Sequence, residues 1–283
     1  MAAAPLARGR AAAAGPVSVE SIGRVALVRM ADAARGNAIG PELAAGLAAA
    51  LAAVAGDPAA HVVVVTGLPN VFAGGADRDH LLRPERAAVE PFVRAFARCA
   101  LPVVAAMQGH AFGGGLTQGL YADVPVLSER SVYAANFANY ALVPEYGTTW
   151  LLRERLGSTL GTEMLLTARG YRGAELRDRR APVRIVPHEQ VLPVSLALAE
   201  GIARAPRHTL LLLKRQLATQ LLAAADAATA VEIGPHEEAW ASADRGRLVA
   251  ERYGRPEEIW RPEPAGARGT GNGGPGEKEE TAT

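Results

Sequence analysis

Two glycine-rich segments are the first candidates for chemistry in this chain. One reads VFAGGAD over residues 71–77, and the other reads MQGHAFGGG over residues 107–115. Glycine has no Cβ atom, so a bound group can approach its backbone N–H closely. A helix that begins inside such a segment also points its unpaired N–H groups and the positive end of its dipole at the same place. Two such segments that meet at one oxygen atom could stabilise an oxyanion.

Either segment alone could equally be a tight turn in the backbone. Neither has the spacing G-x-G-x-x-G or G-x-x-x-x-G-K-[ST], so the sequence gives little support to a phosphate-binding loop. Each segment follows a run of apolar and β-branched residues, HVVVVTG at 61–67 and LPVVAAMQ at 101–108, which is typical of a strand buried on both faces. Their pairing and their order along the chain favour one shared site.

The elements that must position these segments alternate between strand and helix. Further strands are predicted at Val17–Ile22, Val25–Met30 and Val124–Leu127, and helices at Pro41–Ala55, Val89–Cys99 and Gly115–Tyr121. This alternation predicts an α/β fold in which helices cover a sheet. After Gly147 the strand signals nearly vanish, and the predicted helices are Thr148–Leu156, Thr159–Thr167, Leu192–Arg204 and Pro206–Ala225.

The chain therefore divides into four expected parts. We expect a disordered leader over 1–16, an α/β core over 17–191, a helical C-terminal region over 192–261 and a disordered tail over 262–283. No apolar run reaches the length of about 20 residues that a membrane helix needs. The formal net charge of +1 argues against a nucleic-acid partner.

Redox and metal chemistry also find little support in the sequence. The only cysteine is Cys99, which fits a reducing compartment, so we expect a cytoplasmic protein. His61, His188 and His208 show no metal-ligand spacing with carboxylates or with a thiol, and we expect no metal site and no cofactor.

The segments VVVVTG, VFAGGAD and LPVVAAMQGHAFGGGL, in that order, resemble the crotonase (enoyl-CoA hydratase/isomerase) superfamily. The likeness covers about residues 17–240. It implies a spiral of ββα units with a helical C-terminal trimerisation region, and hence a homotrimer or hexamer. It also implies a thioester substrate on CoA or phosphopantetheine. The oxyanion donors that it implies are the backbone N–H groups of Gly74 and Gly114.

Two departures from the family pattern argue against simple hydration. Family hydratases carry one glutamate two residues after the glycine triplet, where this chain has Thr117, and a second in an F-G-x-P-E segment. The corresponding segment here, residues 135–144, contains no carboxylate. Addition of water needs both a base and an acid. Glu145 is a candidate substitute, but it lies past the aligned position, and we interpret it as a loop residue.

Longer strings resemble one branch of this family, the decarboxylating homologue of polyketide β-branching cassettes. They include GHAFGGGLTQGLYAD, TARGYRGAELRDRRAP and EIGPHEEAW. This resemblance implies decarboxylation of a 3-methylglutaconyl group on an acyl carrier protein to a 3-methylcrotonyl-type thioester, through a dienolate held in the oxyanion hole. Two alternatives stay open: an isomerase of enoyl-CoA or enoyl-carrier-protein substrates, and a non-catalytic member that binds carrier proteins.

Two residues are assigned catalytic roles through the resemblance. His236 lies in a segment that resembles the E-x-x-x-H-E of this branch, and we expect it to place the departing carboxylate or to protonate the dienolate. Histidine can do either because it exchanges a proton near neutral pH. Arg78 could grip the carboxylate through two parallel hydrogen bonds. Arginine does not give up a proton, so the acid would be His236 or Tyr140. Without the resemblance, His236 would be read as a surface histidine, and Arg78 could equally be a solvated residue at the start of a helix.

The remaining candidates are expected to line the substrate pocket or to support it. The expected substrate-binding residues are Ala73, Ala76, His80, Phe112, Thr117, Phe137 and Tyr140. His110 is expected to pack or to form a hydrogen bond. Lys214 and Arg215 could meet a carrier protein or the phosphate of a pantetheine arm, although a solvated helix face is the simpler interpretation.

Overall fold

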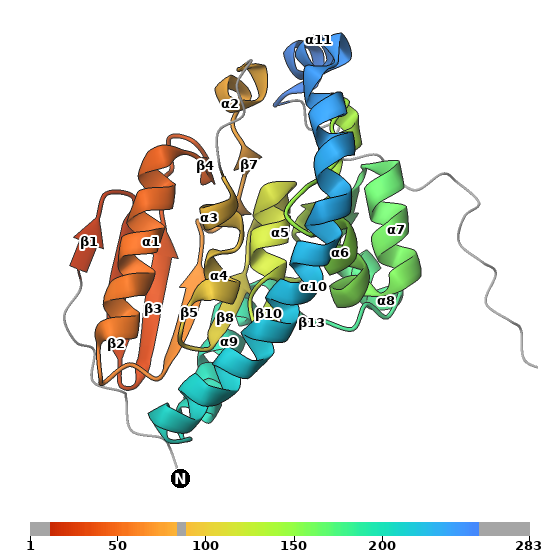
Figure 1. Cartoon of the computed structure of the whole chain (residues 1–283). Coiled ribbons are helices and arrows are strands. Elements are labelled where there is room, and N and C mark those ends of the chain that lie inside the picture. Colours follow the sequence, from red (N-terminus) through yellow and green to blue (C-terminus); the bar gives the residue numbers. More distant parts are fainter. Residues whose placement is uncertain (1–11, 84–88, 255–283) are drawn as a thin grey trace, which may run out of the picture.

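A seven-stranded mixed sheet lies at the centre of the computed structural model, which describes residues 12–83 and 89–254 (Figure 1). In spatial order its strands are β1 (Ala12–Ala14), β2 (Val17–Ile22), β3 (Val25–Met30), β5 (Val62–Thr66), β8 (Val103–Met107), β10 (Val124–Ser128) and β13 (Arg184–Val186). The pairs β1–β2 and β2–β3 are antiparallel, and the other pairs are parallel. Parallel neighbours need crossover connections, which here contain the helices.

Two small sheets are built largely from the glycine-rich segments. One has the order β12 (Gly170–Arg172), β11 (Val132–Ala134), β9 (His110–Phe112) and β6 (Val71–Ala73), and the other pairs β4 (Ala38–Ile39) with β7 (Gly75–Ala76). These strands are too short to show a periodic pattern in the sequence. The expectation that strands nearly vanish after Gly147 was wrong, because β12 and β13 both follow it.

The helices match most of the predicted ranges. Their bounds are α1 (Pro41–Gly56), α2 (Arg78–Leu82), α3 (Glu90–Val93), α4 (Ala95–Arg98), α5 (Gly114–Leu120), α6 (Thr148–Leu156), α7 (Ser158–Thr167), α8 (Gly173–Asp178), α9 (Val191–Ala203), α10 (Arg207–Ala241) and α11 (Ala243–Arg252). Two 3₁₀ helices, η1 (Asn136–Tyr140) and η2 (His188–Gln190), complete the set for the described residues. The alternating α/β order that we predicted is confirmed.

Two helix predictions need correction. The single helix expected over Val89–Cys99 is two short helices, which meet at Arg94 with φ −95° and ψ 7°. The helix expected to end at Ala225 continues to Ala241 and runs through Pro235. Proline removes one helical hydrogen bond to the carbonyl four residues earlier. That carbonyl belongs to Val231, whose side chain is 77% exposed, so water can replace the missing donor there.

Part of the chain that we placed in the leader and in the C-terminal region joins the core architecture. Residues 12–14 form β1 and pair with β2. Helix α9, in the region expected over 192–261, packs against the large sheet. Residues 1–11, 255–261 and the tail expected over 262–283 lie outside the described residues.

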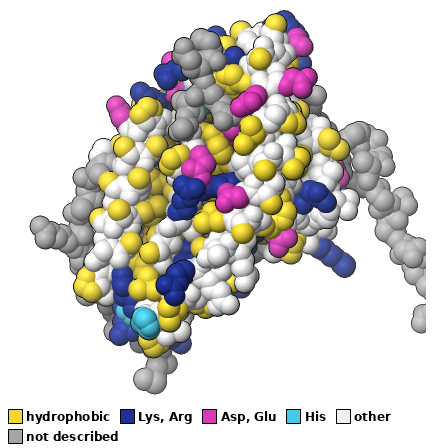
Figure 2. All heavy atoms as spheres, viewed as in Figure 1, with side chains coloured by type: hydrophobic (Ala, Val, Ile, Leu, Met, Phe, Trp, Pro, Cys, Tyr) yellow, Lys and Arg dark blue, Asp and Glu magenta, His cyan; other side chains and the backbone are white. Residues whose placement is uncertain are grey.

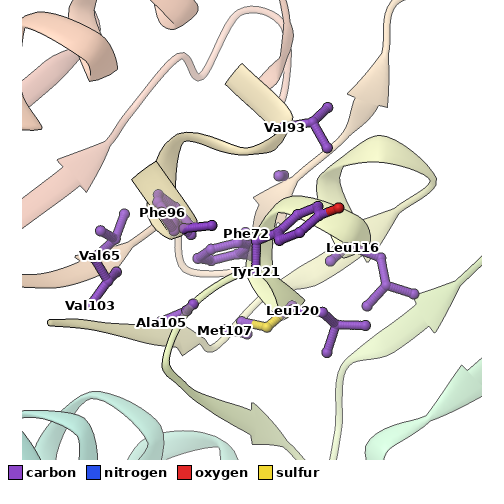
Figure 3. Packing of buried hydrophobic residues seen from close by; sticks show 14 of the residues in the cluster. Val65, Phe72, Val93, Phe96, Val103, Ala105, Met107, Leu116, Leu120 and Tyr121 are labelled. Atoms are coloured by element: carbon purple, nitrogen blue, oxygen red, sulfur yellow. The ribbon is translucent and has the colours of Figure 1, made fainter. Parts of the chain in front are cut away.

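The alternation of valines along β5 places apolar side chains on both faces of the sheet. Val62 and Val64 belong to the cluster that contains α9, whereas Val63 and Val65 belong to the cluster that contains α1. Figure 3 shows the second cluster, in which Phe72, Phe96, Met107 and Tyr121 pack together with other buried apolar side chains. The sheet is therefore covered on both sides, and the glycine-rich segments follow directly from its buried strands.

A buried ion pair fixes helix α10 to this core. Lys214 is 2% exposed, and its ammonium group lies 2.8 Å from Asp123 Oδ2 and donates to the carbonyl of Phe96 at 3.0 Å. Asp123 Oδ2 also accepts the backbone N–H of Val103 at 2.7 Å. Lys214 is thus a structural residue, and the surface role that we considered for it was wrong. Its neighbour Arg215 is exposed.

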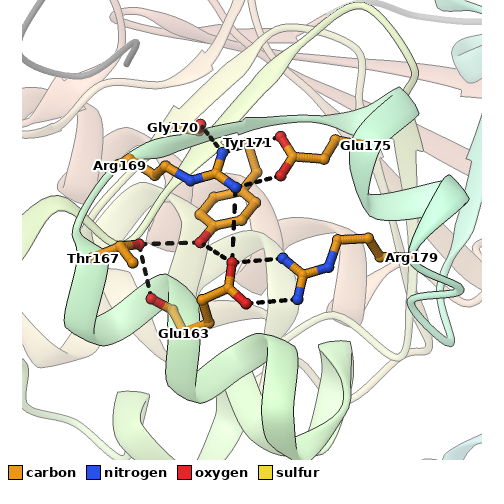
Figure 4. Close-up of polar contacts among 7 residues, drawn as sticks. All are labelled: Glu163, Thr167, Arg169, Gly170, Tyr171, Glu175 and Arg179. Atoms are coloured by element: carbon orange, nitrogen blue, oxygen red, sulfur yellow. Dashed lines mark hydrogen bonds and ion pairs between the residues drawn. The ribbon is translucent and has the colours of Figure 1, made fainter. Parts of the chain in front are cut away.

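The segment TARGYRGAELRDRRAP, residues 167–182, supplies most of a polar network around Arg169 (Figure 4). The guanidinium of Arg169 lies 3.5 Å from the ring centroid of Tyr171 and pairs with Glu175. Arg179 donates two hydrogen bonds of 2.6 Å to Glu163, which also accepts from the hydroxyl of Tyr171 at 2.9 Å. These residues join α7, β12 and α8, so this segment stabilises the fold.

The surface carries charges of both signs and some exposed apolar residues. On the face seen in Figure 2, basic and acidic side chains are interspersed. Leu212, Leu213 and Leu217 of α10 are 43–50% exposed. A trimer or hexamer remains a prediction. Among the described helices, none combines the length and hydrophobicity that crossing a membrane would require.

His110 makes the stability of the fold dependent on pH. Its Nδ1 accepts the backbone N–H of Val132 at 2.9 Å, which joins β9 to β11 and requires an unprotonated Nδ1. Burial, and then the positive charge of Arg172, lower the pKa of His110. The unfolded chain therefore binds more protons than the folded protein below the ordinary histidine pKa of about 6.5. The free energy of unfolding should fall as pH decreases through that range.

Denaturant unfolding between pH 7.5 and 5.5 measures this loss. In His110→Asn the amide oxygen can still accept the N–H of Val132 but does not titrate, so stability should fall less with acidification. The pKa values of His80 and His188 are lowered too, mainly by burial, so part of the pH dependence should persist. An unchanged slope in His110→Asn would contradict the assignment.

Candidate active site

A cavity of about 280 Å³ lies where the two glycine-rich segments meet the C-terminal part of α10. The first segment contributes Gly74, Gly75 and Ala76, and the second contributes Phe112, Gly113 and Gly114. The predicted site residues that line this cavity are Gly74, Ala76, His80, Phe112, Gly114, Phe137, Tyr140 and His236. Much of the rest of the wall is apolar.

Because glycines lack side chains, the backbones of the two segments can pack directly against each other. A Cβ atom on Gly75, whose φ is +78°, would lie 2.6 Å from the carbonyl oxygen of Phe112. A Cβ atom on Gly115 would lie 2.5 Å from the carbonyl oxygen of Ala73. Both positions therefore require glycine, and the backbones of β7 and α5 face one cavity from two sides.

Gly114 has the properties that we predicted for an oxyanion donor. It is the first residue of α5, so its N–H has no partner within the helix. Gly113 before it adopts φ 48° and ψ −120°, a conformation that favours glycine and turns the chain into the helix. The N–H of Gly114 therefore remains available to a group in the cavity that its residue lines.

Gly74 does not have these properties, and its assignment as a donor needs correction. Its N–H donates to the carbonyl of Asn37 at 3.1 Å, which ties the first segment to the strand before α1. Asn37 is itself held by its side chain, which donates to the carbonyls of Met30 and Phe72. The two residues of β7, Gly75 and Ala76, also line the cavity, and β7 pairs with β4.

Three other predicted residues lie outside the cavity wall. Arg78 is exposed, because the side chain of Asp77 caps α2 through the N–H of His80 at 2.6 Å, and the resulting helix brings His80 to the cavity. Ala73 is fully buried in the core. The hydroxyl of Thr117 donates to Gly113 O and lies 3.2 Å from that of Thr148, which lines the cavity in its place.

His236 reaches the cavity from α10, and one of its ring nitrogens is held by the backbone. The side chain is 5% exposed, and its Nδ1–H donates to the carbonyl of Val143 at 2.5 Å. Because Nδ1 is used in this way, Nε2 is the ring atom that can exchange a proton. Within the described part of the chain, Nε2 is buried and makes no hydrogen bond. Glu145 Oε1 lies 3.5 Å from it.

Glu145 belongs to the site, contrary to our interpretation of it as a loop residue. It is 8% exposed and lines the cavity. Its loop is strained, because Tyr146 has φ +63°, a conformation that is rare for a bulky side chain. Such strain persists only where the surroundings hold it, and it is frequent at functional sites.

The surroundings of this loop come from distant parts of the chain. The carbonyl of Tyr146 accepts from the Tyr121 hydroxyl and from Arg94 Nε. Glu232, one helical turn before His236, accepts the N–H groups of Gly147 at 2.7 Å and Thr149 at 2.8 Å. It thereby caps α6, which has no side-chain cap of its own. Helix α10 holds the loop with the same face that presents His236, because Glu232 and His236 are four residues apart on that helix.

Aromatic rings close the cavity around His236. The ring centroid of Trp240 lies 5.7 Å from that of His236 and 5.7 Å from that of His80. Burial lowers the pKa of His80, an effect that Asp77 partly opposes, so this ring is neutral at pH 7. Burial raises the pKa of Tyr253 to about 12, and Tyr140, 6.1 Å away, adds to that effect. Both rings are therefore uncharged at pH 7 where they line the cavity.

Sequence reasoning missed several residues of this site, among them Glu145, Trp240 and Tyr253. Glu145 was noticed and set aside, while Trp240 and Tyr253 were not singled out. Trp240 follows His236 by four residues, a spacing that places both on one helix face, and this signal could have found it. Among the described residues, no three His, Cys, Asp or Glu side chains lie together in a way that could hold a metal ion.

Comparison with known proteins identifies the class to which this fold and site belong. The model of the enoyl-CoA hydratase/isomerase family matches residues 20–253. The chain therefore belongs to this family, which is the crotonase superfamily that the glycine-rich segments resemble. Its fold is the crotonase fold, with mixed sheets and C-terminal helices.

Within the family, the chain is similar to decarboxylases of polyketide biosynthesis. It is 38% identical over 198 residues to bacillaene synthase decarboxylase PksI of Bacillus subtilis (strain 168), across 69% of this chain and 80% of that protein. It is 34% identical to the ECH2 decarboxylase domain of CurF from Lyngbya majuscula, with a TM-score of 0.80, across 84% of this chain and 100% of that domain.

A third relative extends the same similarity. A solved structure of a dehydratase/decarboxylase enzyme couple involved in polyketide β-branching is also 34% identical, with a TM-score of 0.81, across 84% of this chain and 99% of that one. The predicted resemblance to the decarboxylating branch is confirmed.

Proposed function

We propose that this enzyme decarboxylates a 3-methylglutaconyl-type thioester on an acyl carrier protein and yields a 3-methylcrotonyl-type thioester. One observation carries the proposal: the same largely apolar cavity is lined by Gly114, at the N-terminus of α5, and by a buried histidine, His236. The names of the relatives, a bacillaene synthase decarboxylase and an enzyme couple of polyketide β-branching, agree with this reaction.

The geometry supports a reaction in two steps. In the first, the thioester oxygen faces the N–H of Gly114, and the substrate carboxylate lies in the apolar part of the cavity. Removal of water there disfavours a localised carboxylate relative to the dispersed charge of the transition state. The bond to the carboxyl carbon breaks, CO₂ departs, and the electron pair moves through the C=C bond onto the thioester oxygen. In the second step, an acid protonates a carbon of the dienolate.

Incubation with 3-methylglutaconyl carrier protein, followed by intact-mass measurement, tests the proposal. Decarboxylation replaces the carboxylate by hydrogen and removes 44 mass units, the mass of CO₂. No loss of mass, together with migration of a C=C bond in an enoyl thioester, would instead support the isomerase. A protein that binds the carrier protein but converts neither substrate would support the non-catalytic alternative.

The backbone N–H of Gly114, the proposed oxyanion donor, can be removed by a substitution that leaves His236 and the other side chains of the cavity unchanged. Proline lacks an N–H and is tolerated at the first residue of a helix, so Gly114→Pro should lower kcat by about 10²–10³-fold, as loss of one oxyanion donor typically does. Gly114→Ala is the matched control, because its new Cβ meets the same Ile39 side chain at 2.9 Å but keeps the N–H. Equal losses of kcat in both variants would show that crowding, rather than the missing donor, is responsible.

A further inference from the structure

The pairing of Glu145 with His236 is the feature of the site that the two-step reaction does not yet explain. A negatively charged side chain is costly to bury unless it has a partner. Here the protein buries a carboxylate in the substrate cavity, on a strained loop, and 3.5 Å from Nε2 of the only buried histidine of the described residues. An Nε2 that carries a proton is a donor that faces this carboxylate.

The charge of Glu145 also decides between the two roles considered for His236. A substrate carboxylate next to His236 would lie close to the carboxylate of Glu145 as well, and two like charges in one desolvated site repel each other strongly. We therefore place the departing carboxylate elsewhere in the cavity. What remains for His236 is the second step of the reaction, the protonation of the dienolate.

We infer that Glu145 and His236 act together as the proton donor that completes the reaction, and that their fixed position selects the carbon that is protonated. This inference rests on the proposed function. The proton leaves Nε2 and forms a C–H bond at one carbon of the dienolate, while the electron pair on the thioester oxygen restores the C=O bond. The imidazole is left neutral, and a proton from solvent restores it. Glu145 stabilises the proton on Nε2 before the transfer.

Other titratable groups also lie around His236. Those that line its cavity are His80, Tyr140, Tyr146 and Tyr253, and those on its turns of α10 are Glu232 and the exposed Glu237 and Glu238. Arg245 lies over the ring of Trp240. His80 is neutral and Tyr253 is protonated at pH 7, as their shifted pKa values require. Both oxygens of Glu232 accept hydrogen bonds from the start of α6. Glu145 is the acidic residue of the described cavity wall.

The test compares wild type with Glu145→Gln, which keeps the size of the side chain and removes its charge. With 3-methylglutaconyl carrier protein, we expect kcat to fall by about 10–10²-fold, since a positioned acid contributes about 10²–10⁴-fold and His236 remains. KM should change little. A dienolate that waits for a proton from solvent should also give a mixture of α,β- and β,γ-unsaturated products by NMR, where wild type gives one isomer. Glu145→Asp should recover part of the rate.

The controls separate this inference from the proposed function. Glu200→Gln removes the same charge from an exposed position on α9 and should behave as wild type. If wild type does not decarboxylate the substrate, the proposed function fails. If wild type is active and Glu145→Gln retains its kcat and its single product, the inference is overturned while the function stands. A rise in KM with an unchanged product isomer would also overturn it, because Glu145 would then contribute only to substrate binding.

Discussion

Replacement of His236 by asparagine should lower kcat by about 10²–10⁴-fold, the contribution that a positioned general acid typically makes. Asparagine can still donate to the carbonyl of Val143 through its amide, so the loop that carries Glu145 should keep its position. It cannot transfer a proton to carbon. The loss should therefore appear in kcat for decarboxylation, measured by intact mass over time, while the thermal unfolding midpoint stays near that of wild type.

A matched control lies on the same helix. His208 is exposed near the start of α10, far along the helix from the cavity, and His208→Asn makes the same chemical change there. It should leave kcat unchanged. If His236→Asn kept more than about a tenth of the wild-type kcat, well above the range expected for loss of an acid, another group would have to be the proton donor. If both variants lost activity together, the effect would not be specific to the site.

Replacement of Lys214 by methionine should have the largest effect on stability. It leaves Asp123 without its cationic partner in a largely buried position, and removal of one member of a buried ion pair typically costs about 3–5 kcal/mol. The free energy of unfolding, measured in urea at one fixed protein concentration, should fall by that amount. Because Lys214 fixes α10, the helix that carries Glu232 and His236, kcat should also become more sensitive to temperature.

A second substitution tests the cause of this loss. In the double variant with Asp123→Asn, no buried charge remains unpaired, and the amide oxygen can still accept the N–H of Val103, so part of the stability should return. Arg215→Met, at the exposed neighbour, should change the free energy of unfolding by less than about 0.5 kcal/mol. A double variant as unstable as the sum of the two single variants would contradict the ion-pair explanation.

Parts of the fold were predictable because their signals are local. The strands Val17–Ile22 and Val25–Met30 have the predicted bounds, and the buried β-branched run at Val62–Thr66 identified its strand. The short strands of the glycine-rich segments were not predictable in this way. Strands β6, β7 and β9 contain two or three residues each, and they form because the two segments pack on each other, which no periodic pattern records.

The candidate site divides along the same line. Gly114 and His236 could be selected from motifs, and both line the cavity. Arg78 was chosen for its charge and its place after the first segment, but the direction of its side chain depends on how Asp77 caps α2. Glu145 was set aside because it lies past the position that aligns with the family glutamate, and its neighbours in the chain do not record its contact with His236 of α10.

The sequence by itself determined the family, the long buried strands and the two glycine-rich segments, because each of these depends on residues that are close together in the chain. The tertiary structure decided that Lys214 is buried, through a partner 91 residues away. It also decided that His236 contacts the loop that carries Glu145, through a hydrogen bond to Val143, 93 residues away. Such contacts follow from how α10 packs across the core, and the sequence around the residues that make them does not reveal them. The proton donor of the proposed reaction is therefore a property of the folded chain.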